Sequence, residues 1–252
     1  MVEIAISLAI IAFALVAIIG VLPLGLDVQK ENRQETIINQ DAGYFMDAIR
    51  NGARGLDDLT NYVIAITNYW TLYYTNVPPG TPWQLAGVNY DGYDRLGSRV
   101  TSETVLPSFA LSSGSNIVGL LSTPRYVPTA VNGPPAIRSN YIVAFVRALS
   151  GSATEKFPQS DKNVQSLAFS YRMIPEIVSL PAYDTNSPYG KNLQANLTEL
   201  RLLFRWPLLP NWSAGNGRQS YRSLVGGQLM KTNDVNGQTL HFFEPTTFVT
   251  AP

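Results

Sequence analysis

A run of apolar residues near the N-terminus places the strongest constraint on how this chain can fold. Residues 4–26 read IAISLAIIAFALVAIIGVLPLGL and contain no charged side chain. At about 1.5 Å per residue, a helix over this run is long enough to cross a hydrocarbon layer of about 30 Å. Its apolar residues occupy every face, which differs from the one-sided stripe of an ordinary surface helix. The sequence therefore predicts an N-terminal helix that lies in a membrane or in the core of an assembly.

Two simpler roles for this run are a cleaved signal peptide and a plain membrane anchor. A signal peptide begins with a basic region, but no Lys or Arg precedes the run, and the acid Glu3 stands at its start. A plain anchor makes no use of that carboxylate, which is costly in an apolar medium unless it is paired. Residue chemistry alone leaves two roles for Glu3: a solvated acid near a helix N-terminus, or a group that pairs with a neighbour.

The helix is expected to continue beyond the apolar run. The sequence turns polar from Asp27 onward, and apolar residues then recur on one helical face, namely Ile38, Ala42, Phe45 and Ile49. This spacing is typical of a helix with one buried side. Either Gly52 or Gly55 is expected to end it.

The first twenty residues, MVEIAISLAIIAFALVAIIG, resemble the mature N-terminus of type IV pilins and type II secretion pseudopilins. The resemblance rests on Glu3, on the apolar run and on the helix breakers Gly20 and Pro23. It departs from the family in two ways. The family's acid lies slightly deeper, which implies a short stretch before Met1, and Gly20 stands where many pilins carry Pro.

The resemblance implies a structural role and not an enzymatic one. Glu3 would pair with the N-terminal amine of a neighbouring subunit, and Gly20 and Pro23 would loosen the helix between residues 12 and 23. A simple kink is the alternative for that stretch. The implied partners are copies of the same chain and the assembly machinery of the inner membrane. The chain would lie in the membrane first and then in an extracellular filament.

The rest of the chain predicts a β-rich head, which gives an α+β fold. We expect a helix over residues 1–54, with residues 1–26 in the membrane or filament core, and one mainly antiparallel sheet in residues 55–252. Residues 56–74 fit either a short helix or a strand, and residues 77–98 are rich in Pro, Gly and Tyr, which indicates a loop. Alternation of apolar and polar residues and turn signals predict strands over residues 116–121, 141–149, 166–173, 199–206, 221–229 and 240–250.

Few residues of the head carry a recognisable chemistry. Asp91 and Asp94 in NYDGYDRLG offer oxygen ligands for Ca²⁺, although a turn stabilised by the Asp side chains is favoured. Asn196 and Asn211 begin the glycosylation sequons NLT and NWS. His241 is the only histidine and falls in an expected strand, where a role in packing is favoured over catalysis.

Composition narrows the remaining classes of function. The chain has 18 basic and 18 acidic residues, so its net charge does not favour nucleic acid. It contains no Cys, hence no disulfide, and it has no phosphate-binding or metal-binding motif, so no cofactor is expected. Aromatic residues form a possible adhesive or subunit-contact surface: Tyr69, Trp70, Tyr73, Tyr74, Tyr90 and Tyr93. The alternatives to a pilus subunit are a minor pseudopilin and a membrane-anchored periplasmic binding or enzymatic domain.

Overall fold

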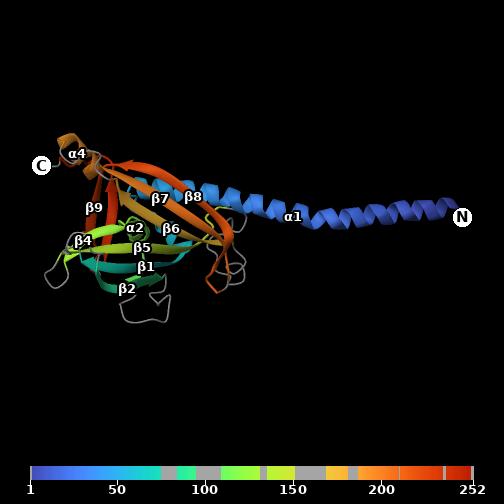
Figure 1. Ribbon diagram of the computed structural model, residues 1–252, viewed down its shortest axis with the longest axis horizontal. Coiled ribbons are helices and arrows are strands. Elements are labelled where there is room, and N and C mark those ends of the chain that lie inside the picture. Colours follow the sequence, from blue (N-terminus) through green and yellow to red (C-terminus); the bar gives the residue numbers. More distant parts are fainter. Residues whose placement is uncertain are drawn as a thin grey trace. The chain divides into compact units, whose positions relative to one another are not determined.

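The computed structural model forms two compact units, Met1–Gln40 and Asp41–Pro252. It describes residues 2–74, 84–94, 109–130, 135–150, 169–180, 187–209, 211–234 and 237–250. Figure 1 shows a long helix at the N-terminus and a large sheet in the second unit. The predicted α+β class, with an apolar N-terminal helix and an antiparallel sheet, is confirmed.

Helix α1 spans Val2–Arg50 without interruption. It therefore continues through Gly20 and Pro23 in the single chain. A proline removes only one backbone donor, and the turns on either side of it can keep their own hydrogen bonds. The loosened stretch between residues 12 and 23 was expected for an assembled filament, and for that state it stays a prediction.

The sequence predicted that either Gly52 or Gly55 ends α1, and Gly52 is the residue that does so. Its φ is 53°, a left-handed conformation that glycine adopts without strain. The Gly52 amide donates to the Ile49 carbonyl at 3.1 Å, and the Ala53 amide donates to the Ala48 carbonyl at 3.0 Å. These two bonds satisfy carbonyl groups that the last helical turn leaves free.

The main sheet has eight strands in the order β3-β2-β1-β5-β6-β7-β8, with β4 paired to β5 (Figure 1). Its pairs are antiparallel except for β2 and β3. The strands are β1 Val63–Tyr74, β2 Gln84–Asp94, β3 Phe109–Ala110, β4 Tyr126–Ala130, β5 Pro135–Arg147, β6 Ser170–Ser179, β7 Leu197–Leu208 and β8 Ala214–Gly226. Strands β9 (Gln228–Asn233) and β10 (Thr239–Glu244) form a separate hairpin. Short helices are η1 (Asp57–Asn61), α2 (Gly114–Leu121) and α4 (Pro188–Asn196).

The larger core of the second unit lies on one face of the sheet, and a smaller buried cluster with Val143, Phe145 and Ile174 lies on the other face. Strand β7 alternates half-buried and buried residues up to Trp206, and its buried residues are Thr198, Leu200, Leu202, Phe204 and Trp206. Strand β6 adds Tyr171 and Met173, and helix α1 adds Phe45 and Ile49, all of them buried. Ala42 and Ile38 are buried as well, so the helical stripe read from the sequence is correct. A sheet with one buried face takes this alternation because successive side chains point to opposite sides.

Several predicted strands differ from the observed elements. Residues 116–121 belong to helix α2 and not to a strand. The Asn116 amide donates to Ser113 Oγ at 3.3 Å, and this cap favours a helix over the apolar sequence that follows. Residues 77–98 were expected to form a loop, yet β2 occupies Gln84–Asp94, because pairing with β1 overrides its low strand propensity.

Other boundaries shifted by smaller amounts. The strand expected over residues 221–229 is two strands, since Gly227 at φ 104° separates β8 from β9. Strand β10 ends at Glu244, well before residue 250. Residues 56–74 contain both expected elements, η1 and then β1. Strand β6 begins at Ser170, and residues 166–168 of the predicted strand lie outside the described part.

Candidate assembly site

The apolar part of α1 is the candidate functional surface, because its large side chains are exposed. Their exposed fractions lie between 53% for Leu15 and 79% for Phe13. The set comprises Val2, Ile4, Ile6, Leu8, Ile10, Ile11, Phe13, Leu15, Val16, Ile18 and Ile19. By length and composition this helix is able to cross a membrane. A continuous apolar surface of this size requires an apolar partner, either lipid or other protein chains.

Glu3 lies in the first turn of α1 and is exposed. The Ser7 hydroxyl donates to the Glu3 backbone carbonyl at 2.8 Å and does not contact the carboxylate. Among the residues that the structure describes, no basic side chain forms an ion pair with Glu3. The positive end of the helix dipole favours an acid here. In a dry environment that alone does not offset the cost of a bare carboxylate, so a cationic partner would be needed.

A buried carboxylate holds α1 to the sheet within the second unit. Asp41 is 1% exposed, and its two oxygens accept four hydrogen bonds. The donors are the amides of Leu149 and Ser150 at 2.9 and 3.1 Å, the Ser150 hydroxyl at 2.7 Å and the Tyr171 hydroxyl at 2.9 Å. Burial raises the pKa of the Asp41 carboxyl, and the four hydrogen bonds act in the opposite direction. Local sequence around Asp41 does not predict these contacts, because their donors lie more than a hundred residues away.

The weak candidates for metal binding lie within a strand. Asp91 and Asp94 belong to β2, where Asp91 is paired with Asn68 and Asp94 with Ala65 of β1. A turn at Asp91, the favoured interpretation, is therefore wrong, whereas the residues that follow Asp94 lie outside the described part. In the described part of the chain, acidic and histidine side chains do not form a group of three that could hold a metal ion.

The two sequons differ in their surroundings. The Asn196 side chain donates to the carbonyls of Asn192 and Val249 and accepts from the Val249 amide, and Thr198 of the same sequon is buried. These contacts occupy the amide that a glycan would need. Asn211 is exposed, and its side-chain oxygen accepts from the amide and hydroxyl of Ser213. Asn196 is half-buried and Asn211 is exposed.

His241 lies in β10, opposite Lys231 of β9. Its side chain is buried, and among the described residues its Nδ1 atom has no hydrogen-bond partner. Burial lowers the pKa of His241 to about 4, and the charges of Lys231 and Arg138 add to this effect. His241 is therefore a neutral, buried imidazole, and it lies in a strand as expected.

The aromatic surface expected from the sequence is partly present on β1. Tyr69 is 42% exposed and stands directly opposite Tyr141 of β5, with ring centroids 6.4 Å apart. Trp70 points to the other face, where the Arg138 guanidinium lies 4.4 Å from its ring centroid. Tyr73 and Tyr74 are half-buried, whereas the side chains of Tyr90 and Tyr93 in β2 lie outside the described part.

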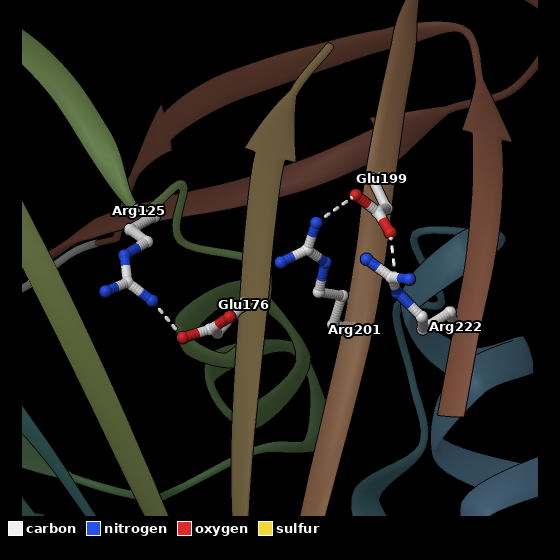
Figure 2. A network of polar contacts seen from close by, with 5 residues as sticks. All are labelled: Arg125, Glu176, Glu199, Arg201 and Arg222. Atoms are coloured by element: carbon white, nitrogen blue, oxygen red, sulfur yellow. Dashed lines mark hydrogen bonds and ion pairs between the residues drawn. The ribbon is translucent and has the colours of Figure 1, made fainter. Parts of the chain in front are cut away.

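A network of charged residues lies on the face of the sheet opposite to Leu200 and Leu202. Glu199 of β7 accepts from Arg201 at 2.5 Å and from Arg222 of β8 at 2.8 Å (Figure 2). Arg125 pairs with Glu176 of β6 on the same face. The hydrogen bond from Arg201, followed by the charges of both arginines, lowers the pKa of Glu199. The alternation of Leu and Arg in β7 predicted that such a polar face exists, but not which charges would pair.

Comparison with known proteins finds no matching family model, no matching curated protein and no matching solved structure.

Proposed function

We propose that the chain is a structural subunit of an extracellular helical filament of the type IV pilus kind. It assembles by packing the apolar part of α1 against the same segment of neighbouring copies. Before assembly this segment lies in the inner membrane, where the assembly machinery takes it up. The head, residues 55–252, then faces outward and carries no catalytic role.

One observation supports this proposal most directly: an uncharged helical surface exposed on all sides, with a single acid at its start. Packing of such helices side by side buries apolar area at roughly 25 cal/mol per Å², an upper estimate when the helix leaves lipid instead of water. A carboxylate at the start of the segment would add register, because it must meet a cation in the dry core. The N-terminal amine of a neighbour would supply that cation.

The apolar segment also fits a plain membrane anchor for a periplasmic domain, and a subunit that primes a secretion pseudopilus. Only the placement of Glu3 favours assembly over a plain anchor. A minor pseudopilin would occur in few copies at one end of a filament, whereas a major subunit forms the filament along its whole length. Imaging of filaments therefore separates these alternatives.

The test is the Glu3→Ala variant, produced in cells that contain a type IV assembly machinery. We expect the variant to enter the membrane with a folded head but to yield at least tenfold fewer filaments, because the axial register is lost. Asp47→Ala removes an exposed acid of the same helix and is the control. Shed filaments are counted by electron microscopy and the protein by quantitative immunoblot. A Glu3→Ala yield equal to that of the control would refute the pairing, and wild-type chains that never leave the membrane would refute the filament.

A further inference from the structure

Three arginines stand in a row across the outer face of the sheet. Arg172 of β6 is directly opposite Arg205 of β7, and Arg205 is directly opposite Arg218 of β8. Directly opposed residues point to the same face of a sheet, and neighbouring strands are about 4.8 Å apart. This arginine row (Arg172, Arg205 and Arg218) therefore places three positive charges within about 10 Å. Like charges in opposed positions destabilise a sheet, and an acidic partner would reduce this repulsion.

In a second row of the same face, separated from the arginine row by the pair Ile174 and Leu203, acidic side chains compensate the arginines. There Arg201 and Arg222 share Glu199, and Glu176 binds Arg125 (Figure 2). Among the described residues, by contrast, no acidic side chain forms an ion pair with the arginine row. The Nε atoms of Arg172 and Arg205 are shielded from solvent and have no hydrogen-bond partner among the described residues. Arg218 is exposed.

The opposite charge is concentrated on α1. Asp27, Glu31 and Glu35 follow each other at intervals of four residues, so they lie on one face of the helix. All three are exposed, and within the described residues none of them forms an ion pair. At 3.6 residues per turn, Arg33 falls on the opposite side of the helix, whereas Lys30, three residues after Asp27, lies beside one end of the acidic face. This acidic stripe (Asp27, Glu31 and Glu35) spans about 12 Å, at about 1.5 Å per residue.

We propose that, in the filament, the acidic stripe of one subunit binds the arginine row of a neighbouring subunit. The proposal rests on the proposed function, since it needs copies of the chain side by side. Three carboxylates meet three guanidinium groups over similar lengths, about 12 Å against about 10 Å. Arginine suits this contact because its planar fork binds a carboxylate with two parallel hydrogen bonds. A second copy is the favoured occupant because the chain as a whole is neutral, with 18 basic and 18 acidic residues, so each subunit supplies both halves of the contact.

The absence of cysteine from the chain allows a direct test by cross-linking. Glu31→Cys and Arg205→Cys are combined in one full-length chain, and purified filaments are treated with a short bismaleimide. We expect a ladder of covalent multimers on a denaturing gel. The control combines Glu31→Cys with Lys231→Cys, an exposed residue of the separate β9–β10 hairpin, and should give no ladder. Filaments without a ladder, or an equal ladder in the control, would overturn the contact and leave the proposed function intact.

Charge reversal tests the energetic role of the same contact. We expect Glu31→Arg with Glu35→Arg to lower filament yield at least fivefold, and Arg172→Glu with Arg205→Glu to do the same. All four changes in one chain should restore most of the yield, because the contact is rebuilt with its charges exchanged. If the arginines only stabilised the fold of the head, substitutions on α1 would not restore the filament yield. Normal yield from either double reversal would overturn the contact and favour an acidic polymer as the partner of the row. If the wild-type chain forms no filaments, the proposed function fails and this contact fails with it.

Discussion

At the residue scale, the hydrogen bonds of Asp41 hold the last part of α1 against the sheet. It accepts hydrogen bonds from the chain that follows β5, through Leu149 and Ser150, and from Tyr171 of β6. A buried carboxylate is costly unless donors surround it, and here four donors do so. Tyr171 is fully buried, and burial together with the charge of Asp41 raises its pKa well above the ordinary value. Asp41 therefore fixes where the last part of α1 meets the sheet.

Replacement of Asp41 by Asn tests this account. The amide NH₂ of Asn would face an N–H or O–H donor where a carboxylate oxygen now accepts, so we expect a loss of about 2 kcal/mol in the free energy of unfolding. Asp47→Asn, on an exposed position of the same helix, should stay within about 0.5 kcal/mol of wild type. Urea unfolding of the full-length protein in micelles, followed by Trp fluorescence, measures both. A stabilised Asp41→Asn variant would show that desolvation of the carboxylate outweighs its hydrogen bonds.

The lowered pKa of His241 predicts that the free energy of unfolding depends on pH. Its pKa is lowered from 6.5 to about 4 in the folded state, so the unfolded chain binds the extra proton first as the pH falls. Stability from this group is fully present above about pH 6.5 and is lost as the pH falls toward 4, by up to about 3 kcal/mol. His241→Gln should flatten the slope in this window while the carboxylates titrate as before. Equal slopes for both proteins would show that the imidazole is solvated.

At the element scale, helix α2 depends on a glycine that lies against the β9–β10 hairpin. A Cβ atom added at Gly119 would lie 2.8 Å from Leu240 Cβ and 2.9 Å from Phe242 Cζ. We therefore expect Gly119→Ala to cost about 1–3 kcal/mol, since the packed neighbours must move. Gly43 in α1 has open space around its Cβ position, so Gly43→Ala should instead stabilise by about 0.5–1 kcal/mol. The same unfolding assay compares the two, and equal effects would contradict the packing of α2.

The elements also show which parts of the fold the sequence could predict. The apolar run and the buried stripe of α1 carry a strong helical signal, and β7 alternates clearly, so both were predicted. Residues 116–121 were misread because a short apolar run fits a strand and a helix equally well, and the Ser113 cap decided the outcome. Strand β2 carries glycines and polar residues and exists through its pairing with β1, which is a long-range effect. The contacts of Asp41 were not predictable, because Ser150 and Tyr171 are more than a hundred residues away in sequence.

For the candidate site, the sequence predicted the apolar helix but not the distribution of charge, and the pairing of Glu3 stays a prediction. The register between strands aligns Arg172, Arg205 and Arg218, and only the paired sheet reveals it. Spacing along a helix, in contrast, is fixed by its geometry, so the stripe of Asp27, Glu31 and Glu35 can be recognised in the sequence once a partner is sought. Local periodicity is thus readable from sequence, whereas cross-strand neighbours depend on register.

At the scale of the whole molecule, apolar, acidic and basic side chains lie in different parts of the chain. The first part of α1 is apolar and exposed, the next part is acidic on one face, and the arginine row lies in the head. The head has a buried core on the sheet, as the side chains of Phe204, Met173 and Tyr171 illustrate. An apolar surface supplies cohesion without direction, while paired charges supply register. This division predicts that the head folds without the apolar segment and that assembly requires it.

The last prediction is that a chain beginning at Asp27 is soluble and mostly monomeric. The truncation removes the exposed apolar side chains from Val2 to Ile19, each of which would contribute roughly 1.5–3 kcal/mol when buried. It retains Asp41, the acidic stripe and the entire sheet, so its circular dichroism should stay rich in β-structure and its Trp fluorescence should match that of the full-length protein. Charge contacts between exposed groups contribute only about 0–1 kcal/mol each, too little to hold a filament by themselves. Sedimentation velocity at micromolar concentration measures the mass, and electron microscopy checks for filaments. If this shortened chain polymerises into filaments of native diameter, the head surfaces and not α1 supply the main cohesion, and the order of the two contributions must be reversed.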